Sequence, residues 1–271
     1  MKMSEYESRL AALDEVIRSY RRIMIAFSGG VDSSVLLDRC VSVLGVENVI
    51  AATGVSQTYT PEERADAEDL VARLGVTHVV IETDELADPC FASNPKDRCF
   101  HCKTELYAKI IKAATDNSCN VIFDATNADD LSDYRPGLKA AREAGVKSPL
   151  ADSGITKADI REMAAKTLPH IADKPASPCL ASRIPYGTHI TAQDLLKIAA
   201  AERFLRAHGF PTVRVRHHGN LARIEVPADQ IAKLCSDEVR ETVANRLREI
   251  GYSWVSIDIE GFKSGSMNRV I

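Results

Sequence analysis

A short segment rich in glycine, serine and aspartate has the residue types that hold phosphate groups. Ser28-Gly29-Gly30-Val31-Asp32-Ser33-Ser34 follows an apolar run at residues 23–27 and leads into a helical pattern that begins at Val35. Two adjacent glycines let the backbone turn tightly, and N–H groups at the start of a helix favour an anion. The segment has neither the lysine of a Walker A loop nor the spacing G-x-G-x-x-G. We therefore expect a nucleotide-binding loop of another type.

Within this segment, Asp32 has two chemical roles open to it. Its carboxylate can hold Mg²⁺ against the phosphates of ATP, or it can cap the helix that follows. We expect the hydroxyls of Ser28, Ser33 and Ser34, together with local N–H groups, to grip the pyrophosphate. An ordinary strand-to-helix turn with a helix cap is the alternative.

A second polar segment follows another apolar run. The polar segment Asp124-Ala125-Thr126-Asn127-Ala128-Asp129-Asp130 overlaps the end of the apolar run at residues 121–125. In open α/β folds, ligands bind at the carboxyl edge of the parallel strands. We therefore expect Asp124 and Asn127 to contribute to the nucleotide site, with a solvated loop as the alternative.

Three of the seven cysteines have surroundings suited to thiol or metal chemistry. Cys99-Phe100-His101-Cys102 is a C-x-x-C pair, and Cys179 lies in a proline-rich loop with Arg183, which could stabilise a thiolate. Three thiolates can hold a [4Fe–4S] cluster on three irons and leave the fourth open to an extra sulfur ligand. His101 offers a structural zinc site as the alternative.

The other cysteines lack such a pattern. Cys40, Cys119 and Cys235 lie within or beside apolar helix or strand patterns, where a buried structural cysteine is expected, and Cys90 has no assigned role. An odd number of cysteines in a chain without a secretory segment argues against a disulfide framework.

The elements that must position these residues alternate between strand-length and helix-length patterns. Apolar runs predict strands at residues 23–27, 49–55, 78–82 and 121–125, and more weakly at 146–150. Capping residues predict helices that begin after Ser4, Thr60 and Thr156. This alternation predicts an α/β fold with a doubly wound, mostly parallel sheet.

The pattern changes near residue 175. Residues 174–187 contain three prolines and cannot form one continuous helix. Beyond them we predict a helix from Thr191, strands at 212–216 and 221–226, a helix over 229–250 and a strand at 254–259. We interpret this part as a smaller α+β domain with a mainly antiparallel sheet. The predicted domains are residues 1–178 and 179–271.

Composition excludes several classes of protein. Of the 271 residues, 45% are hydrophobic and 27% are charged, which is ordinary for a globular chain, and the formal net charge is −4. Residues 181–271 carry 13 Lys and Arg against 10 Asp and Glu, so the acidic excess lies before them. No apolar run approaches the roughly 18 residues of a membrane span. We expect a cytoplasmic protein with no membrane or nucleic-acid partner.

Four segments together carry a family resemblance. They are residues 28–34, residues 94–103, residues 124–130 with 133–137, and residues 177–187. Taken in this order, they resemble the LarE family of the PP-loop, or N-type ATP pyrophosphatase, superfamily. The resemblance covers nearly the whole chain and implies an adenine nucleotide alpha hydrolase-like fold for the first domain.

The resemblance implies a sulfur transferase in the biosynthesis of the nickel-pincer nucleotide. With ATP and Mg²⁺, such enzymes adenylate a carboxylate of a pyridinium-3,5-dicarboxylate mononucleotide, release pyrophosphate and form a thiocarboxylate. Where the family has one active-site cysteine, the equivalent of Cys179 gives up its own sulfur and becomes dehydroalanine. Members with further cysteines use a [4Fe–4S] cluster, which Cys99 and Cys102 favour here. Family analogy also suggests a homo-oligomer, such as a hexamer.

The negative groups of such a substrate need cations. Period-two alternation in residues 212–218 places Arg214 and Arg216 on one face of a strand, opposite Val215. The resemblance assigns arginines of this strand to substrate binding, with Glu225 as a further candidate. A solvated edge strand is the alternative.

Two other functions remain open. A tRNA thiolase of the same superfamily would share the loop and the C-x-x-C pair, but the sequence has no Lys- or Arg-rich arm. A non-catalytic nucleotide-binding regulator would explain the loop and leave the segment around Cys179 unexplained.

Overall fold

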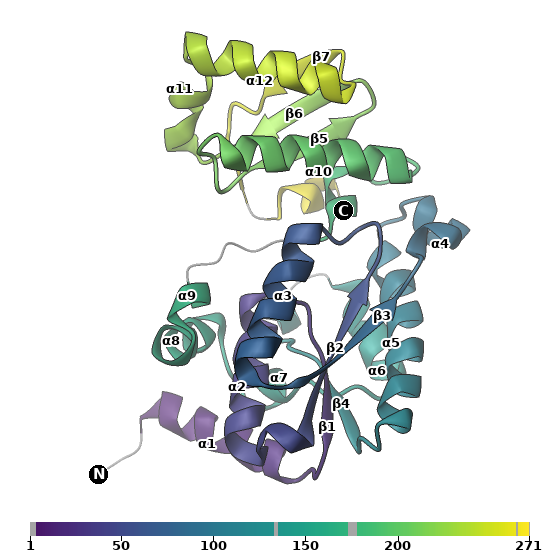
Figure 1. The fold of residues 1–271 in the computed structure, drawn as a ribbon, viewed down its shortest axis with the longest axis vertical. Helices are drawn as coiled ribbons and strands as arrows, with labels where there is room; N and C mark the ends of the chain where they lie inside the picture. The colour runs from purple at the N-terminus through teal and green to yellow at the C-terminus, as the bar shows by residue number, and fades with distance from the viewer. Residues whose placement is uncertain (1–3, 133–134, 173–177, 264, 271) are drawn as a thin grey trace. The chain divides into compact units, whose positions relative to one another are not determined.

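The computed structural model describes residues 4–132, 135–172, 178–263 and 265–270. Asp133 and Tyr134 of the third family segment, and most of the proline-rich segment at residues 174–179, lie outside the described residues. The chain divides into two units (Figure 1). The first comprises Met1–Glu85 and Asp97–Ser177, and the second comprises Leu86–Lys96 and Pro178–Ile271. A short segment from the middle of the first unit's sequence thus belongs to the second unit.

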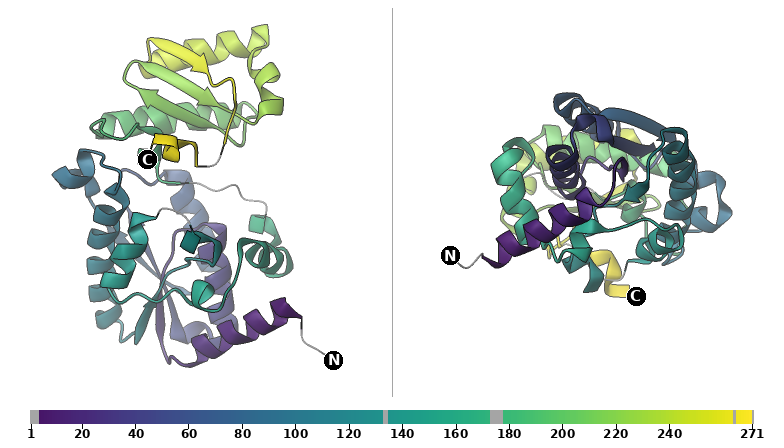
Figure 2. Two further views of the ribbon diagram at one scale, coloured as in Figure 1. Left: turned by 180° about the vertical axis from the view of Figure 1, so that it is seen from behind. Right: turned by 90° about the horizontal axis from the view of Figure 1, so that it is seen from below.

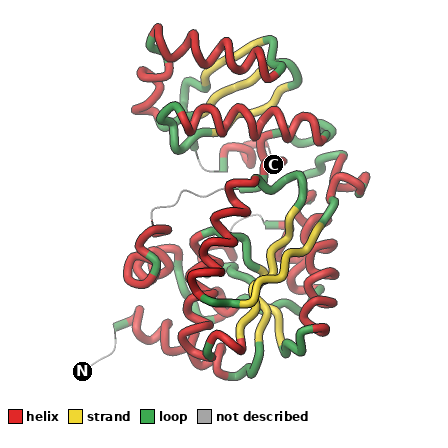
Figure 3. Tube along the Cα trace, in the orientation of Figure 1, coloured by secondary structure: helices red, strands yellow, loops and turns green. Residues whose placement is uncertain are grey.

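The first unit is built on a four-stranded parallel sheet with strand order β3-β2-β1-β4 (Figure 3). Its strands are β1 (Ile23–Ala26), β2 (Val49–Val55), β3 (Thr77–Glu82) and β4 (Val121–Phe123). Because β2 and β4 lie on opposite sides of β1, the connections after β1 and β4 diverge at the carboxyl edge of the sheet, where such folds bind ligands.

The predicted strand at residues 146–150 is wrong. Lys147 forms only an isolated bridge with Phe123, and Pro149–Asp152 is a short helix, α7. Proline at the first helical position suits a helix start and cannot donate to a strand ladder, which explains the difference.

Helices cover both faces of this sheet, as a doubly wound fold requires (Figures 1 and 2). Ile23 and Ile25 pack with α1, α2, α3 and α8 on one face, and Met24 packs with α5 and α6 on the other. The predicted caps at Ser4, Thr60 and Thr156 are confirmed as complete capping boxes. The helices are α1 (Glu5–Arg18), α2 (Val31–Leu44), α3 (Pro61–Leu74), α5 (Arg98–Asp116), α6 (Pro136–Glu143), α8 (Lys157–Thr167) and α9 (Pro169–Ala172).

The second unit packs helices against a three-stranded sheet with order β5-β6-β7. Strands β5 and β6 are antiparallel, but β6 and β7 are parallel, so the prediction of a mainly antiparallel sheet is only half right. The reason is that α12 carries the chain back across the sheet before β7 begins. The elements are α4 (Pro89–Ala92), α10 (Ala192–Ala207), β5 (Arg214–His218), β6 (Leu221–Glu225), α11 (Ile231–Leu234), α12 (Asp237–Ile250) and β7 (Trp254–Ile257).

Two boundaries in this unit differ from prediction. Strand β5 begins two residues later than expected, at Arg214. The helix predicted over residues 229–250 is interrupted after α11, where Cys235 ends one helix and Ser236 begins the next. Serine favours a helix N-cap, so the interruption has a local cause.

A buried histidine should make the stability of the second unit depend on pH. His217 on β5 is 3% exposed, with Nδ1 at 3.2 Å from the hydroxyl of Tyr252 and Nε2 at 3.4 Å from a carboxylate oxygen of Asp194. Burial lowers the pKa of His217, and the nearby Asp194 offsets this only in part.

We expect the stability of the second unit to fall as the pH drops from about 7.5 to about 5.5. A histidine in the unfolded chain has a pKa near 6.5, so below that pH the unfolded chain binds more protons than the folded one. Urea unfolding of the wild type and of His217→Gln at both pH values measures the effect. A steeper loss of unfolding free energy in the wild type supports this role, and parallel losses contradict it.

Candidate nucleotide and sulfur-transfer site

The glycine-rich loop joins β1 to α2 and leaves little room for a larger residue at Gly29. Gly29 has φ of +70°, and a Cβ atom there would lie 3.1 Å from the Cβ of Ala67 on α3. Gly30 is the N-cap residue of α2 and supplies no side-chain cap. The N–H groups of the first turn, beginning at Val31, lack intrahelical acceptors, which leaves them for a bound anion.

Serine side chains brace the loop from within. The hydroxyls of Ser33 and Ser34 donate to the carbonyl of Gly30 at 3.0 and 2.8 Å, and both side chains are buried. Ser28 is exposed, with its Oγ 3.1 Å from that of Ser33. In addition, the hydroxyl of Tyr59 donates to the carbonyl of Ser28 at 3.1 Å. Two of the three hydroxyls expected to grip pyrophosphate therefore hold the shape of the loop itself.

Asp32 lies in the first turn of α2 and turns away from the helix backbone. Its Oδ2 accepts a hydrogen bond of 3.0 Å from the side chain of Asn127 and pairs with the ammonium of Lys157. Its Oδ1 is buried and has no hydrogen-bond partner within the described part of the chain. The N-cap position belongs to Gly30, so the capping role considered for Asp32 is not what the structure shows. The carboxylate retains one oxygen for a ligand.

The structure brings Asn127 to Asp32, as the position of both at the carboxyl edge of the sheet requires. Asn127 is fully buried, and its Oδ1 accepts from the N–H groups of Asp129 and Asp130 at 3.0 and 3.2 Å. These bonds fix the turn after β4 and aim the amide at Asp32. Lys157, whose ammonium pairs with Asp32, is a residue of the candidate site that sequence reasoning missed. Its signal was present, since it is the first residue of the helix that the cap at Thr156 predicts.

Asp124 directly follows β4, but its hydrogen bonds are to Thr126 and Tyr107. Its Oδ1 accepts from the N–H of Thr126 at 3.1 Å, and its Oδ2 accepts from the hydroxyl of Tyr107 at 3.4 Å. The ammonium of Lys103 lies 5.3 Å from the centre of the Tyr107 ring. Interaction with Tyr107, followed by those with Cys102 and Asp124, raises the pKa of Lys103. The ammonium of Lys103, the residue after the C-x-x-C pair, therefore keeps its positive charge beside Tyr107.

The C-x-x-C pair occupies the first turn of α5. Cys99 is exposed and Cys102 is half-buried. The thiol of Cys102 donates to Oε1 of Glu85 at 3.6 Å, and the hydroxyl of Thr83 donates to the same oxygen at 2.9 Å. Glu85 is 5% exposed, and its Oε2 has no hydrogen-bond partner among the residues described. Two thiols at a helix N-terminus are well placed to carry negative charge as metal ligands.

The seven cysteines all lie in the described part of the chain and form no disulfide there. Cys40 is buried as expected, and burial raises the pKa of its thiol. Cys119 is half-buried. Cys235 is exposed because it ends the short helix α11, so the prediction of a buried structural cysteine is wrong there. Cys90 is also exposed.

In the second unit, Cys179 is exposed at the start of a 3₁₀ turn formed by Leu180–Arg183. Arg183 is 1% exposed, and two of its nitrogens bind the carboxylate of Glu202 at 2.8 and 2.9 Å. Its third nitrogen donates to the carbonyls of Pro178 and Cys179. Burial would raise the pKa of Glu202, but the hydrogen bond and charge of Arg183 outweigh it and lower that pKa. Arg183 therefore holds the backbone at Cys179.

Arg214 and Arg216 are buried, so the alternative of a solvated edge strand is wrong. Arg216 binds both carboxylate oxygens of Glu225 at 2.9 and 2.7 Å. Arg214 lies 5.2 Å from the ring centre of Phe262. Burial, followed by the charge of Arg183, lowers the pKa of Arg214 to about 10. Three buried guanidiniums against the two buried carboxylates of Glu202 and Glu225 make this region attractive to an anion.

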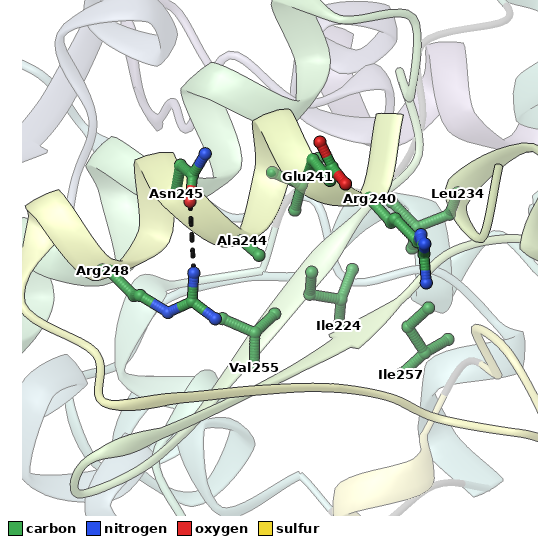
Figure 4. A pocket seen from close by; sticks show the side chains of 10 residues that line it. Ile224, Leu234, Arg240, Glu241, Ala244, Asn245, Arg248, Val255 and Ile257 are labelled. Carbon is green, nitrogen blue, oxygen red and sulfur yellow. Dashed lines mark hydrogen bonds between the residues drawn. The ribbon is translucent and has the colours of Figure 1, made fainter. Parts of the chain in front are cut away.

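A pocket of about 380 Å³ opens between α12 and strands β6 and β7 of the second unit (Figure 4). Its lining combines apolar side chains such as Ile224 and Ile257 with Arg240 and Arg248. None of the residues proposed for chemistry lines this pocket, so we do not assign it to the site.

Comparison with known proteins decides the family. A family model described as NAD synthase matches residues 6–119. An uncharacterised protein of Synechocystis sp. is 40% identical over 265 residues, which is 98% of each chain. The pyridinium-3,5-bisthiocarboxylic acid mononucleotide synthase of Lactiplantibacillus plantarum is 36% identical over 269 residues, which is 99% of this chain and 97% of that protein. The chain belongs to the LarE family.

Not every part of this LarE-family chain is shared with the wider superfamily. The NAD synthase match ends at residue 119, before Asp124 and Cys179. The tRNA-specific 2-thiouridylase MnmA of Azorhizobium caulinodans is 28% identical over 73% of this chain and 60% of that protein. The similarity to the Lactiplantibacillus protein, in contrast, runs through both units, and it confirms the resemblance drawn from the four motifs.

Proposed function

We propose that this LarE-family enzyme adenylates a carboxylate of pyridinium-3,5-dicarboxylate mononucleotide, releases pyrophosphate and converts the carboxylate to a thiocarboxylate. The observation that carries the proposal is the buried Oδ1 of Asp32, which has no partner in the described chain although it lies in a loop built to hold phosphate. A buried acceptor left unsatisfied costs about 1–3 kcal/mol, so a ligand is expected there.

Asp32 and its neighbours fit ATP with Mg²⁺. Carboxylate oxygen is a preferred ligand of Mg²⁺, and Oδ1 of Asp32 supplies it; the metal would neutralise charge on the phosphates. N–H groups in the first turn of α2, starting at Val31, would donate to the phosphate oxygens. Lys157 balances the charge of Asp32 and, through this pairing, would lie near the same phosphates. These residues would favour departure of pyrophosphate when the substrate carboxylate attacks the α-phosphorus.

The sulfur step needs a nucleophile at the acyl-adenylate, and Cys179 is the exposed thiol we assign to it. If Cys179 itself donates, its thiolate attacks the carbonyl carbon and AMP leaves with the electron pair of the broken C–O bond. Loss of the Cα proton then breaks the Cβ–Sγ bond, which leaves dehydroalanine in the chain and sulfur on the product.

We favour a second source, a [4Fe–4S] cluster held by Cys99, Cys102 and Cys179. The donors fit, because all three are cysteine thiols outside disulfides and the first two are one helix turn apart on α5, with the Cys102 thiol 3.6 Å from Oε1 of Glu85. Such a cluster would supply an extra sulfide and spare Cys179. Zinc with His101 is the remaining alternative.

Iron and acid-labile sulfide analysis of anaerobically reconstituted protein separates these sources. We expect both elements in the wild type and their loss in Cys99→Ser and Cys102→Ser. Absence of both from the wild type, with Cys179 losing the mass of its sulfur during turnover, would establish the sacrificial route.

Arg214 is the arginine of β5 that we propose to bind the negative groups of the substrate. Loss of a charged hydrogen-bond donor costs about 1.5–3 kcal/mol, so we expect Arg214→Gln to weaken mononucleotide binding by about 10- to 100-fold. Isothermal titration measures the dissociation constant. Arg240→Gln, an exposed residue of α12, is the matched control. Equal affinities for the two variants would remove Arg214 from the substrate site.

A mutation of Arg216 tests folding as well as substrate binding, because Arg216 is paired with Glu225. Removing Arg216 breaks a buried ion pair and leaves the Glu225 carboxylate with the longer contact to Arg223 at 3.3 Å; breaking a buried pair costs up to about 3–5 kcal/mol. A weak-binding Arg216→Ala variant would therefore report on folding as much as on recognition.

The proposed partners follow from this chemistry. We propose a phosphorylated small molecule as substrate, no nucleic-acid partner, a homo-oligomer and a cytoplasmic location. Among the described residues, none of the helices is long and apolar enough to span a membrane. A tRNA thiolase is the second candidate function, supported by the partial similarity to MnmA, and a salt-dependent shift of tRNA on adding the protein would favour it.

A further inference from the structure

The segment Leu86–Lys96 interrupts the sequence of the first unit yet belongs to the second. It contains α4, whose N-cap Asp88 accepts a hydrogen bond from the N–H of Cys90. It ends near Asn94, which is fully buried and has φ of +57°. Such a backbone conformation is rare outside glycine, and asparagine tolerates it better than most residues.

Asn94 binds the chain that follows Cys179. Its side-chain amide donates to the carbonyl of Ile184 at 3.2 Å and to that of Pro185 at 2.8 Å. Its own carbonyl accepts from the N–H of Gly187 at 2.8 Å. One residue thus makes three hydrogen bonds to Ile184, Pro185 and Gly187 of a loop about ninety residues away in sequence.

The same loop is held at its other end. Arg183 donates to the carbonyls of Pro178 and Cys179, and Glu202 fixes the guanidinium. The carbonyl of Ser182 accepts from Arg216 at 2.9 Å. Cys179 itself stays exposed, so it is a reactive group on a short loop that is bracketed by buried hydrogen bonds on both sides.

We propose that Asn94 is a positioning residue for Cys179. By fixing residues 184–187, it limits the positions that the Cys179 thiol can take, whether the thiol attacks directly or holds a cluster. A reacting group displaced by 1 Å can lose on the order of 10²-fold in rate. The kinetic part of the inference rests on the proposed function, whereas the restraint on Cys179 does not.

Two variants separate the side-chain bonds from the backbone conformation. Asn94→Gly keeps a positive φ accessible and removes the amide donors. Asn94→Asp keeps the shape but sets a carboxylate against the carbonyls of Ile184 and Pro185. The matched control is Asn117→Asp, because the Asn117 amide also donates to a backbone carbonyl, that of Ala113 on α5.

The first measurement is the rate of Cys179 alkylation by iodoacetamide, followed by peptide mass spectrometry. Cys235, exposed in the same unit, is the internal reference. We expect the ratio of the Cys179 rate to the Cys235 rate to rise several-fold in both Asn94 variants and to stay unchanged in Asn117→Asp. An unchanged ratio in the folded Asn94 variants overturns the restraint, and does so whether or not the proposed reaction occurs.

The second measurement is thiocarboxylate formed per pyrophosphate released in a single turnover. A misplaced sulfur donor leaves the acyl-adenylate to water, which returns the carboxylate and AMP. We therefore expect this ratio to fall by about 10- to 100-fold in Asn94→Gly while pyrophosphate release is kept. General unfolding would lower both products together, and Asn94→Asp then supplies the second folded test. A wild type that releases no pyrophosphate would refute the proposed function instead.

Discussion

Asp32→Ala should fold normally and release pyrophosphate from ATP on the order of 10³-fold more slowly than the wild type. The substitution removes the buried oxygen assigned to Mg²⁺ and leaves Lys157 without its carboxylate partner. The fold should survive because Lys157 is half-exposed, and an ion pair of this kind contributes at most about 1 kcal/mol.

Pyrophosphate release in the presence of the mononucleotide, with circular dichroism as a folding check, measures this effect. Asp38→Ala is the matched control, since it removes an acidic residue from the same helix away from the loop. Asp32→Asn tests charge against shape, and we expect it to be nearly as slow as Asp32→Ala. Turnover of Asp32→Ala within a few-fold of the wild type would contradict the assignment of Asp32 to Mg²⁺ binding.

Cys179→Ser should abolish thiocarboxylate formation, a loss of at least about 10³-fold, while pyrophosphate release continues. A serine hydroxyl is neither an effective nucleophile at neutral pH nor a good ligand for iron. Because Cys179 is exposed, the change should have little effect on stability. Mass spectrometry of the nucleotide product measures the sulfur transferred.

Cys235→Ser is the control for this experiment, because it removes another exposed thiol of the same unit. Cys99→Ser adds a distinction. If a cluster supplies the sulfur, this variant loses thiocarboxylate formation as well, whereas the sacrificial route still allows one turnover. Sulfur transfer by Cys179→Ser at the wild-type level would move the donor elsewhere in the chain.

Local patterns predicted most of the first unit correctly. Caps at Ser4, Thr60 and Thr156 mark helix starts because the side chain and the N–H groups that it satisfies lie within four residues. The strands around Ile23 and Val49 were equally clear, since a strand covered on both faces is apolar along its whole length. The errors arose where tertiary contacts determine the structure. The direction of β7, for example, follows from the path of α12.

The residues of the candidate site also divide into those that the sequence identifies and those that only the structure identifies. Asp32 was recognisable from its loop, and Cys179 from its family motif. Lys157, Glu85 and Asn94 were not, because each acts through a partner that is distant in sequence or, for Glu85, on a neighbouring element.

The sequence by itself determined the chemistry that this protein has available, namely a phosphate loop, a set of cysteine thiols and a family of sulfur-transfer enzymes. Residue type and short spacing are enough for that, because they specify which groups can bind phosphate or carry sulfur. Only the tertiary structure decided which of these groups already form hydrogen bonds or ion pairs within the protein. Ser34 braces its own loop, Arg183 holds the backbone at Cys179, and Arg216 is bound to Glu225. The physical reason is that burial removes water as a competing partner, so each buried polar group takes its role from the neighbours that the fold supplies.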